Sequence, residues 1–133
     1  MADGPLLGDT DVIAFDGCAT LAELFVMRCR ENGPKVAHRE KKLGVWRSHT
    51  WDEYFDTARL IGQALIELGV QRGEVVSILA EDRREWLYSD MGVMGIGAIA
   101  NGVYTTDSAA QLAYLVNDSG TKVLFVENDE QLD

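Results

Sequence analysis

The middle of the chain alternates between apolar and polar stretches in a way that predicts a strand, a helix and a second strand. Val75–Ala80 is a short, mostly β-branched run, typical of a strand buried on both faces. After a polar patch, Trp86–Ala100 is apolar and glycine-rich, and too long for one strand. We expect Asn101–Gly102 to end this helix and Val103–Thr105 to begin the next strand. This order predicts a crossover unit in a parallel sheet.

Capping boxes predict the beginnings of three further helices. In each box a threonine or serine precedes a glutamate or glutamine by three residues. The three pairs are Thr20 with Glu23, Thr50 with Glu53, and Ser108 with Gln111. The first helix should end at Asn32–Pro34, because proline cannot continue it, and the third at Gly120. The second carries apolar residues at the spacing of one helical face.

Residues 35–49 predict a hairpin of two short strands, 35–39 and 45–49, with one wet face. Basic residues in its turn are candidates for phosphate binding, although a solvated tip is the simpler interpretation. Residues 122–126 are apolar enough for another interior strand, and 128–133 resemble the start of a further helix.

Together these elements predict an α/β fold with a mainly parallel sheet, flanking helices and a small β-hairpin. The expected strands lie near 75–80, 102–105 and 122–126, and the expected helices at 51–68, 84–100 and 109–117. The hairpin should extend the sheet edge or form a side sheet. Residues 1–17 are expected to be a mobile arm, with a short extended piece at Val12–Phe15, and residues 18–133 to be one truncated α/β subdomain.

Composition narrows the class of protein. With 12 basic and 22 acidic residues among 133, the net charge of -10 argues against nonspecific binding to nucleic acid or to an anionic membrane, because phosphate repels a negative surface. A local basic patch remains compatible with this charge. Cys18 and Cys29 are too few for a disulfide framework. The acidic N-terminus is unlike a secretory signal, and no apolar run is long enough to predict a transmembrane helix. We therefore expect a cytoplasmic protein.

Gly95–Ala100 matches the dinucleotide fingerprint G-x-G-x-x-[GA] letter for letter. Its position is wrong for that function, because the glycines should follow a strand directly and here they end a helix. We expect instead that Gly92, Gly95 and Gly97 let the helix lie close against the sheet.

Three other groups of residues have the residue types of a functional site. Asp118–Lys122 has the residue types of a phosphate loop without its spacing, and is better explained as a helix cap. His38 and His49 have no partners at metal-ligand or catalytic spacing, which favours structural histidines. Glu81–Glu85 holds three carboxylates, but its two arginines favour a salt-bridged helix start. We therefore predict no metal site and no catalytic residue.

The same central stretch resembles the N-terminal part of acyl-adenylate-forming ligases, specifically the long-chain fatty acyl-CoA synthetase branch. The resemblance runs from about Thr20 to the end of the chain. The matching segments are Val75–Ala80, Arg84-Glu85-Trp86, Gly97–Thr106, Ser108–Gly120 and Lys122–Glu127. One departure is Thr105, where the family usually has proline, and threonine leaves that strand exit less rigid.

The resemblance implies an enzyme that uses ATP and Mg²⁺ to form an acyl-adenylate from a fatty acid, and then makes a thioester with CoA. The family's phosphate-binding loop and its mobile C-terminal domain are expected beyond residue 133. The resemblance therefore implies that these residues alone are inactive and bind no cofactor. A lipid substrate also leaves room for peripheral membrane contact.

Open parallel sheets bind ligands at the carboxyl ends of their strands. Arg83, Tyr104, Thr105 and Thr106 lie at such ends and are the substrate-proximal candidates, with structural turns as the alternative. A truncated sheet would expose an edge, which predicts self-association, with a dimer as one form.

Two other classes remain as alternatives. A free-standing doubly wound signalling domain would need a lysine at the end of a strand, whereas Lys122 begins one. A small dinucleotide-binding domain is disfavoured by the position of its glycines.

Overall fold

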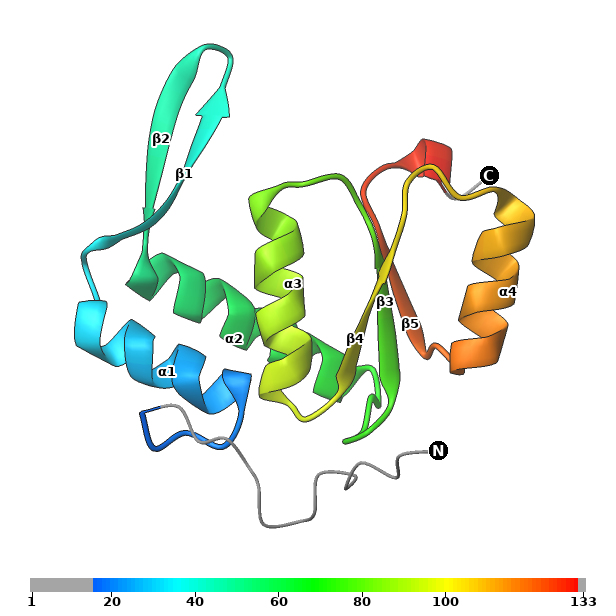
Figure 1. Ribbon diagram of the computed structural model, residues 1–133, viewed down its shortest axis with the longest axis horizontal. Helices are drawn as coiled ribbons and strands as arrows, with labels where there is room; N and C mark the ends of the chain where they lie inside the picture. The colour runs from blue at the N-terminus through cyan, green and yellow to red at the C-terminus, as the bar shows by residue number, and fades with distance from the viewer. Residues whose placement is uncertain (1–15, 132–133) are drawn as a thin grey trace, which may run out of the picture.

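The computed structural model describes residues 16–131, which form a three-stranded parallel sheet, flanking helices and a separate hairpin (Figure 1). The α/β class predicted from the sequence is confirmed. The helices are α1 (Leu21–Asn32), α2 (Trp51–Glu67), α3 (Arg84–Gly95) and α4 (Ala109–Ser119), with a 3₁₀ turn, η1, at Asp129–Gln131. The strands are β1 (Val36–Lys42), β2 (Val45–Thr50), β3 (Val75–Leu79), β4 (Ile99–Val103) and β5 (Val123–Val126).

β3 is the central strand, with β4 and β5 parallel to it on either side. Val75 pairs with Ile99 and Leu79 with Val103, so the predicted crossover unit is present. The capping boxes at Thr50 and Ser108 both form, with reciprocal side-chain and backbone hydrogen bonds. At Thr20 the hydroxyl accepts from the Glu23 amide, while the Glu23 carboxylate accepts from the Ala19 amide.

The predicted extent of α3 was wrong. The helix ends at Gly95 rather than at Ala100, and Asn101–Gly102 lie inside β4 instead of capping a helix. Gly97 has φ +76°, and its amide donates to the carbonyl of Met94, so the chain turns at this point. The apolar run continued unbroken through the turn into a strand, and apolar periodicity therefore could not locate the boundary.

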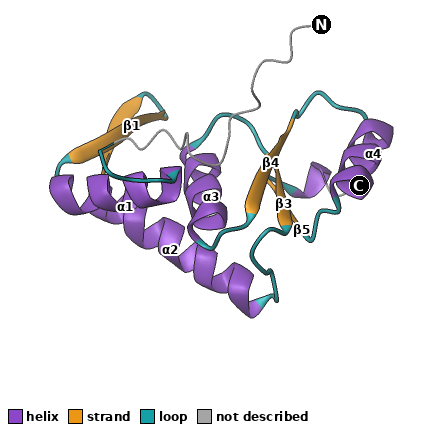
Figure 2. Ribbon diagram, turned by 60° about the horizontal axis from the view of Figure 1, so that its bottom comes forward, coloured by secondary structure: helices purple, strands orange, loops and turns teal. Residues whose placement is uncertain are grey.

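The core lies between the sheet and the α2–α3 layer. Figures 1 and 2 place α1, α2 and α3 on one side of the sheet and α4 on the other. Its fully buried members come from α2, β3 and α3: Leu65 is 1% exposed, and Val76 and Val93 are 0% exposed. The amphipathic faces of two helices thus cover one side of the strands, as the sequence pattern predicted.

The glycines of α3 serve a different contact from the predicted one. A Cβ on Gly92 would lie 2.8 Å from the carbonyl oxygen of Ala58 and 2.8 Å from Cγ2 of Ile61, both on α2. Gly92 therefore allows close approach of helix to helix, rather than of helix to sheet. A Cβ on Gly95 would meet nothing within 4 Å.

The hairpin forms a two-stranded antiparallel sheet of its own, which is one of the two predicted arrangements. Its strands run further than predicted, because Lys42 pairs with Val45 and only Leu43 and Gly44 form the turn. Both turn residues have positive φ, 51° and 80°, as a two-residue hairpin turn of this hand requires.

The chain ends lie largely outside the described residues. The predicted extended piece at Val12–Phe15 and most of the predicted arm fall there, as do residues 132 and 133. In place of a longer final helix, the described part of 128–133 contains the short turn η1. Among residues 16–131, no helix has both the length and the apolar character needed to cross a bilayer.

Candidate functional site

The carboxyl ends of β3, β4 and β5 meet at one edge of the sheet, which is the upper edge in Figure 1. The segments that leave this edge carry Glu81 and Arg83 after β3, Thr105 after β4, and Glu127 after β5. Sites in open parallel sheets form where strands end in this way, because loops from neighbouring strands converge. This is the candidate substrate-facing edge of the protein.

Hydrogen bonds tie the three strand exits together. The Arg83 guanidinium donates to Oε1 of Glu127 at 2.6 Å, and the Glu81 amide donates to its Oε2 at 2.9 Å. The Thr105 hydroxyl donates to Oε1 of Glu81 at 2.8 Å. The exits of β3, β4 and β5 therefore form one linked polar network.

Charge and hydrogen bonding lower the pKa values of two carboxyl groups at this edge, Glu127 and Glu85. The Glu81 amide, and then Arg83, lower the pKa of Glu127. For Glu85 partial burial acts in the opposite direction, but hydrogen bonds from its own amide and from Arg84 outweigh it, so its pKa is also lowered. These groups are therefore anionic at neutral pH and poorly suited to act as general acids.

A pocket of about 250 Å³ opens beside this network. Its apolar lining includes Ile78, Trp86 and Phe125, and Arg83 and Glu127 stand at its polar side. The Trp86 ring lies against β4 at Gly102, where an added Cβ would lie 3.1 Å from Cζ2 of the ring. An apolar wall with a charged rim is the kind of surface on which a ligand can be positioned.

The predicted candidates are only partly brought together. Arg83 and Thr105 join the network through Glu127 and Glu81. Tyr104 is 77% exposed, and Thr106 is also exposed, so both face away from the protein interior.

Sequence reasoning missed Glu127, although it directly follows β5. The rule that selected Tyr104 and Thr105 at the end of β4 would also have selected Glu127 at the end of β5. Arg83 and Arg84 both pair with Glu85, at 3.2 and 3.1 Å, which confirms the predicted salt-bridged helix start.

The two histidines form a structural cluster at the base of the hairpin. Their rings stack with centroids 5.1 Å apart, and Nε2 of His38 lies 3.1 Å from the Tyr88 hydroxyl. Burial lowers the pKa of His38, and His49 and Arg84 lower it further. The Tyr54 ring meets His38 edge-on at 5.6 Å. This cluster anchors the hairpin to α2 and α3.

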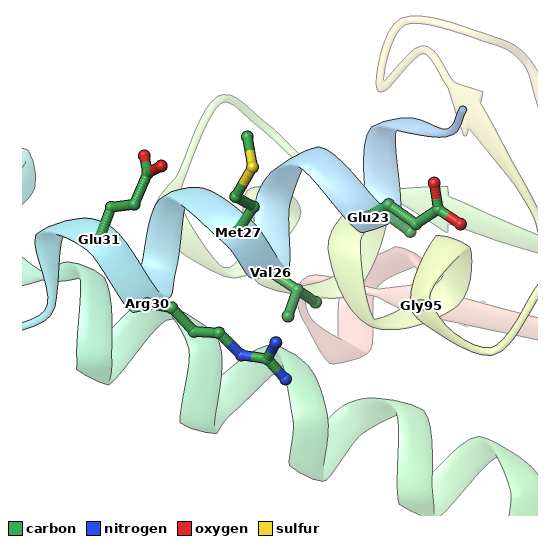
Figure 3. A pocket seen from close by; sticks show the side chains of 7 residues that line it. Glu23, Val26, Met27, Arg30, Glu31 and Gly95 are labelled. Carbon is green, nitrogen blue, oxygen red and sulfur yellow. The ribbon is translucent and has the colours of Figure 1, made fainter. Parts of the chain in front are cut away.

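A separate hollow of about 580 Å³ lies between α1 and the end of α3 (Figure 3). Val26 and Met27 contribute apolar surface, while Glu23 and Glu31 are charged. Both carboxylates already serve α1, because Glu23 caps its start and Glu31 accepts from Arg28 at 2.8 Å. This hollow is therefore a helix–helix junction and not a built site.

Lys122, the lysine of the rejected phosphate loop, pairs with Glu74 at 3.7 Å at the opposite edge of the sheet. Gly120 caps α4 in the left-handed conformation, as the cap interpretation predicted. Within the described part of the chain, no three histidine, cysteine, aspartate or glutamate residues are grouped so that they could hold a metal ion.

Comparison with known proteins gives the class. Residues 25–133 match the family model described as "AMP-binding enzyme". The chain is 34% identical over 113 residues to the long-chain-fatty-acid–CoA ligase ACSBG2 of Rattus norvegicus, a match that covers 85% of this chain and 17% of that protein. This chain thus spans about 17% of the length of that relative.

Solved structures agree with this class. The anthranilate CoA ligase AuaEII, in complex with anthranoyl-AMP, is similar with a TM-score of 0.71 and 29% identity over 77% of this chain and 19% of its own. The N-terminal subdomain of Klebsiella oxytoca NpsA has a similar fold, with a TM-score of 0.71 and 18% identity over 82% of this chain and 27% of its own.

This chain belongs to the AMP-binding enzyme family. Its fold is that of the N-terminal subdomain of acyl-adenylate-forming ligases.

Proposed function

We propose that this chain forms the N-terminal part of a long-chain fatty acid–CoA ligase. Such an enzyme activates a fatty acid with ATP and Mg²⁺ as an acyl-adenylate and then transfers the acyl group to CoA. The observation that carries the proposal is the 34% identity to a relative named for this reaction, over 85% of the chain.

Within that enzyme, we assign the chain a positioning role. The network of Arg83, Glu127, Glu81 and Thr105 fixes the three strand exits, and the pocket beside Trp86 gives them an apolar wall. These side chains hydrogen-bond to one another, so they are better suited to supporting neighbouring segments than to binding a triphosphate. Stabilisation of the adenylation transition state requires such a clamp.

A chimera tests the proposal. The 133 residues replace the matching segment of the rat ligase, and thioester formation from palmitate, ATP and CoA is followed by mass spectrometry. We expect activity within about tenfold of the parent ligase, since a correctly seated scaffold preserves the catalytic groups of the remainder. A chimera that folds cooperatively and makes no thioester would contradict the proposal.

The same chimera tests the exposed strand-end candidates. We expect the double variant Tyr104→Ala/Thr106→Ala to raise KM for one substrate, whereas Leu60→Ala, which changes an exposed residue of α2, should leave the kinetics unchanged. If both variants behave like the unsubstituted chimera, Tyr104 and Thr106 are turn residues only.

The isolated 133 residues should show no ATP–pyrophosphate exchange. Exchange above the background of a heat-denatured sample would contradict the positioning role, because this chain alone would then catalyse adenylation.

The isolated chain also tests self-association. Within residues 16–131 the outer edges of β4 and β5 have no paired strand, and open edges recruit other strands. We expect dimers or larger species by light scattering, and a monomer would remove this part of the proposal.

We also propose a cytoplasmic location with peripheral membrane contact. Cys18 and Cys29 are free thiols, which suits a reducing compartment, and a fatty acid substrate partitions into lipid. Imaging of the chain fused to a fluorescent protein is the direct check. Recovery of the fusion from a secretory compartment would contradict this location.

A further inference from the structure

The β1–β2 hairpin is the one described element that projects clear of the body. Figure 1 shows it extending past the start of α2, at the same end of the molecule as the carboxyl edge of the sheet. Every residue from Lys41 to Ser48 is exposed. A pocket of about 550 Å³ separates His38–Lys41 of the hairpin from Asp82–Leu87, so the hairpin stands directly beside the candidate edge.

The tip of the hairpin is apolar. Leu43 is 94% exposed, Trp46 64% and Val45 62%, and all three lie within four consecutive residues around the two-residue turn. A solvated hairpin tip normally carries polar residues, because exposed apolar side chains gain nothing from water. A cluster of this kind at a projecting tip indicates a surface that becomes covered by something apolar.

The flanks of the same tip are basic. Residues 39–47 contain Arg39, Lys41, Lys42 and Arg47 but only one acid, Glu40, which gives a local charge of +3 in a chain of net charge -10. Lys41 pairs across the strands with Trp46, and its Nζ lies 5.9 Å from the centroid of the indole ring. Cations beside a tryptophan and a leucine match the layered chemistry of a bilayer interface, where headgroups lie above acyl chains.

The hairpin is also held rigidly at its base. His38 and His49 stack on one another, and His38 contacts Tyr54 and Tyr88 of the helices. The tip is therefore presented by a pre-organised β-ribbon, which lowers the entropic cost of docking.

We propose that the hairpin docks the protein onto an anionic phospholipid bilayer. Leu43, Val45 and Trp46 enter the interface, and Arg39, Lys41, Lys42 and Arg47 contact the headgroup phosphates. Charge complementarity selects this occupant, because an acidic bilayer attracts the basic hairpin while the acidic body of the chain stays in water. The hairpin is thus the surface through which the proposed membrane contact is made. This docking does not depend on the ligase assignment.

Vesicle sedimentation of the 133-residue chain tests the proposal. Vesicles of phosphatidylcholine are compared with vesicles in which about 30% is phosphatidylserine. We expect binding to the anionic vesicles at least about tenfold stronger than to the neutral ones, and weaker binding at about 500 mM salt than at about 50 mM, because exposed charges are screened.

Variants separate the two halves of the surface. Lys41→Gln/Lys42→Gln should weaken binding about 25-fold, from about fivefold for each removed charge. Leu43→Ser/Trp46→Ser should weaken it at least about tenfold by removing apolar insertion. The matched controls, Arg30→Gln/Lys122→Gln and Leu68→Ser/Tyr114→Ser, change equally exposed residues off the hairpin and should stay within about twofold. Circular dichroism melts confirm that each variant is folded.

Tryptophan fluorescence gives a second readout. Trp46 should shift to the blue on anionic vesicles, and Trp46→Phe should abolish that shift while Trp51 and Trp86, both half-buried, remain as background. The proposal is overturned if the chain fails to sediment with anionic vesicles at low salt, if neutral vesicles bind it equally, or if Trp46→Phe keeps the shift. It is also overturned if the tip variants abolish dimers seen by light scattering but leave vesicle binding intact, since the tip would then contact a second copy.

Discussion

The two faces of the sheet differ in how completely they are covered. On the α2–α3 side, Val76 and Val93 are fully buried, and Leu65 is 1% exposed. On the α4 side, the helix contributes no buried residue. Leu124 and Val126, which alternate along β5 with the core-facing Val123 and Phe125, are only half-buried. One face of the sheet is therefore covered by a closed core, and the other face is only partly covered.

The chemistry of the two faces differs as well. The face opposite the core carries a network of polar side chains. The Ser77 hydroxyl lies 2.7 Å from the Thr121 hydroxyl and accepts a hydrogen bond from the Asn101 side-chain amide at 3.0 Å. Ser77 is 0% exposed, whereas Asn101 and Thr121 are half-buried, so this network is only partly enclosed. The difference indicates that α2, α3 and β3 form the best-packed part of the described residues. Under the proposed function, the α4 face would contact the remainder of the ligase.

Truncation of one leucine on each side should give the largest contrast. We expect Leu65→Ala to lower the free energy of unfolding by about 3 kcal/mol, because it leaves a cavity in the closed core. Leu115→Ala on α4 should cost less than about 1.5 kcal/mol, since that side chain is only half-buried. Urea unfolding measures both. Equal losses would show that the two faces are equally well packed.

The contact between α2 and α3 gives the next test, with two glycines of α3. Gly92→Ala should destabilise by about 2 kcal/mol, because its Cβ would collide with backbone and side-chain atoms of α2. Gly95→Ala in the same helix meets open space and should be neutral or stabilising by up to about 1 kcal/mol. A Gly92→Ala variant as stable as Gly95→Ala would mean that the two helices can move apart without cost.

The polar network predicts a smaller effect on the open face. Ser77→Ala should cost about 1 to 2 kcal/mol, because it leaves Asn101 and Thr121 short of one partner in a buried place. Ser48→Ala, which removes an exposed hydroxyl from the hairpin, should change the unfolding midpoint in urea very little. If the two serine variants have the same midpoint, the network does not stabilise this face.

The hairpin base should respond to pH with the smallest effect. The pKa of His38 is lowered in the folded protein, chiefly by burial, so its neutral form is favoured there. This contribution to stability is present above the ordinary histidine pKa of about 6.5 and is lost as pH falls from that value through the lowered one. Hydrogen exchange of the β1 and β2 amides should accelerate below that pH, after correction for the intrinsic rate.

The matched control for this prediction is His38→Gln, which cannot take up a proton in this range. It should flatten the pH dependence of the corrected exchange rate. An unchanged dependence in His38→Gln would assign the effect to another group at the base of the hairpin.

Features encoded within a few residues were predictable from the sequence. The boxes at Thr50 and Ser108 set the beginnings of α2 and α4, and Gly120 ends α4, because each signal acts on its own backbone. The end of α3 was not predictable from periodicity. Val93–Ala100 is apolar throughout, although it contains the end of α3, a turn and the start of β4. The positive φ of Gly97 marks the turn between helix and strand.

The candidate edge was predictable as a place but not as a network. The rule for parallel sheets selected Arg83 and Thr105, whereas their bonds to Glu127 and Glu81 join residues far apart in sequence. The exposure of Leu43 agrees with the predicted solvated turn, whereas that of Trp46 did not follow from a pattern that predicted a hairpin with one wet face. Trp46 is exposed because β1 and β2 project away from the helices and the sheet (Figure 1).

Hydrogen exchange on α4 and β5 tests the central claim most directly. The amides of these elements are followed in the isolated chain and in the active chimera with the rat ligase, with those of α2 and α3 as the internal reference. We predict rapid exchange of α4 and β5 in the isolated chain and strong protection in the chimera, while α2 and α3 stay protected in both. Slow exchange of α4 and β5 in the isolated chain, unchanged in the chimera, would contradict an open face that the rest of a ligase covers.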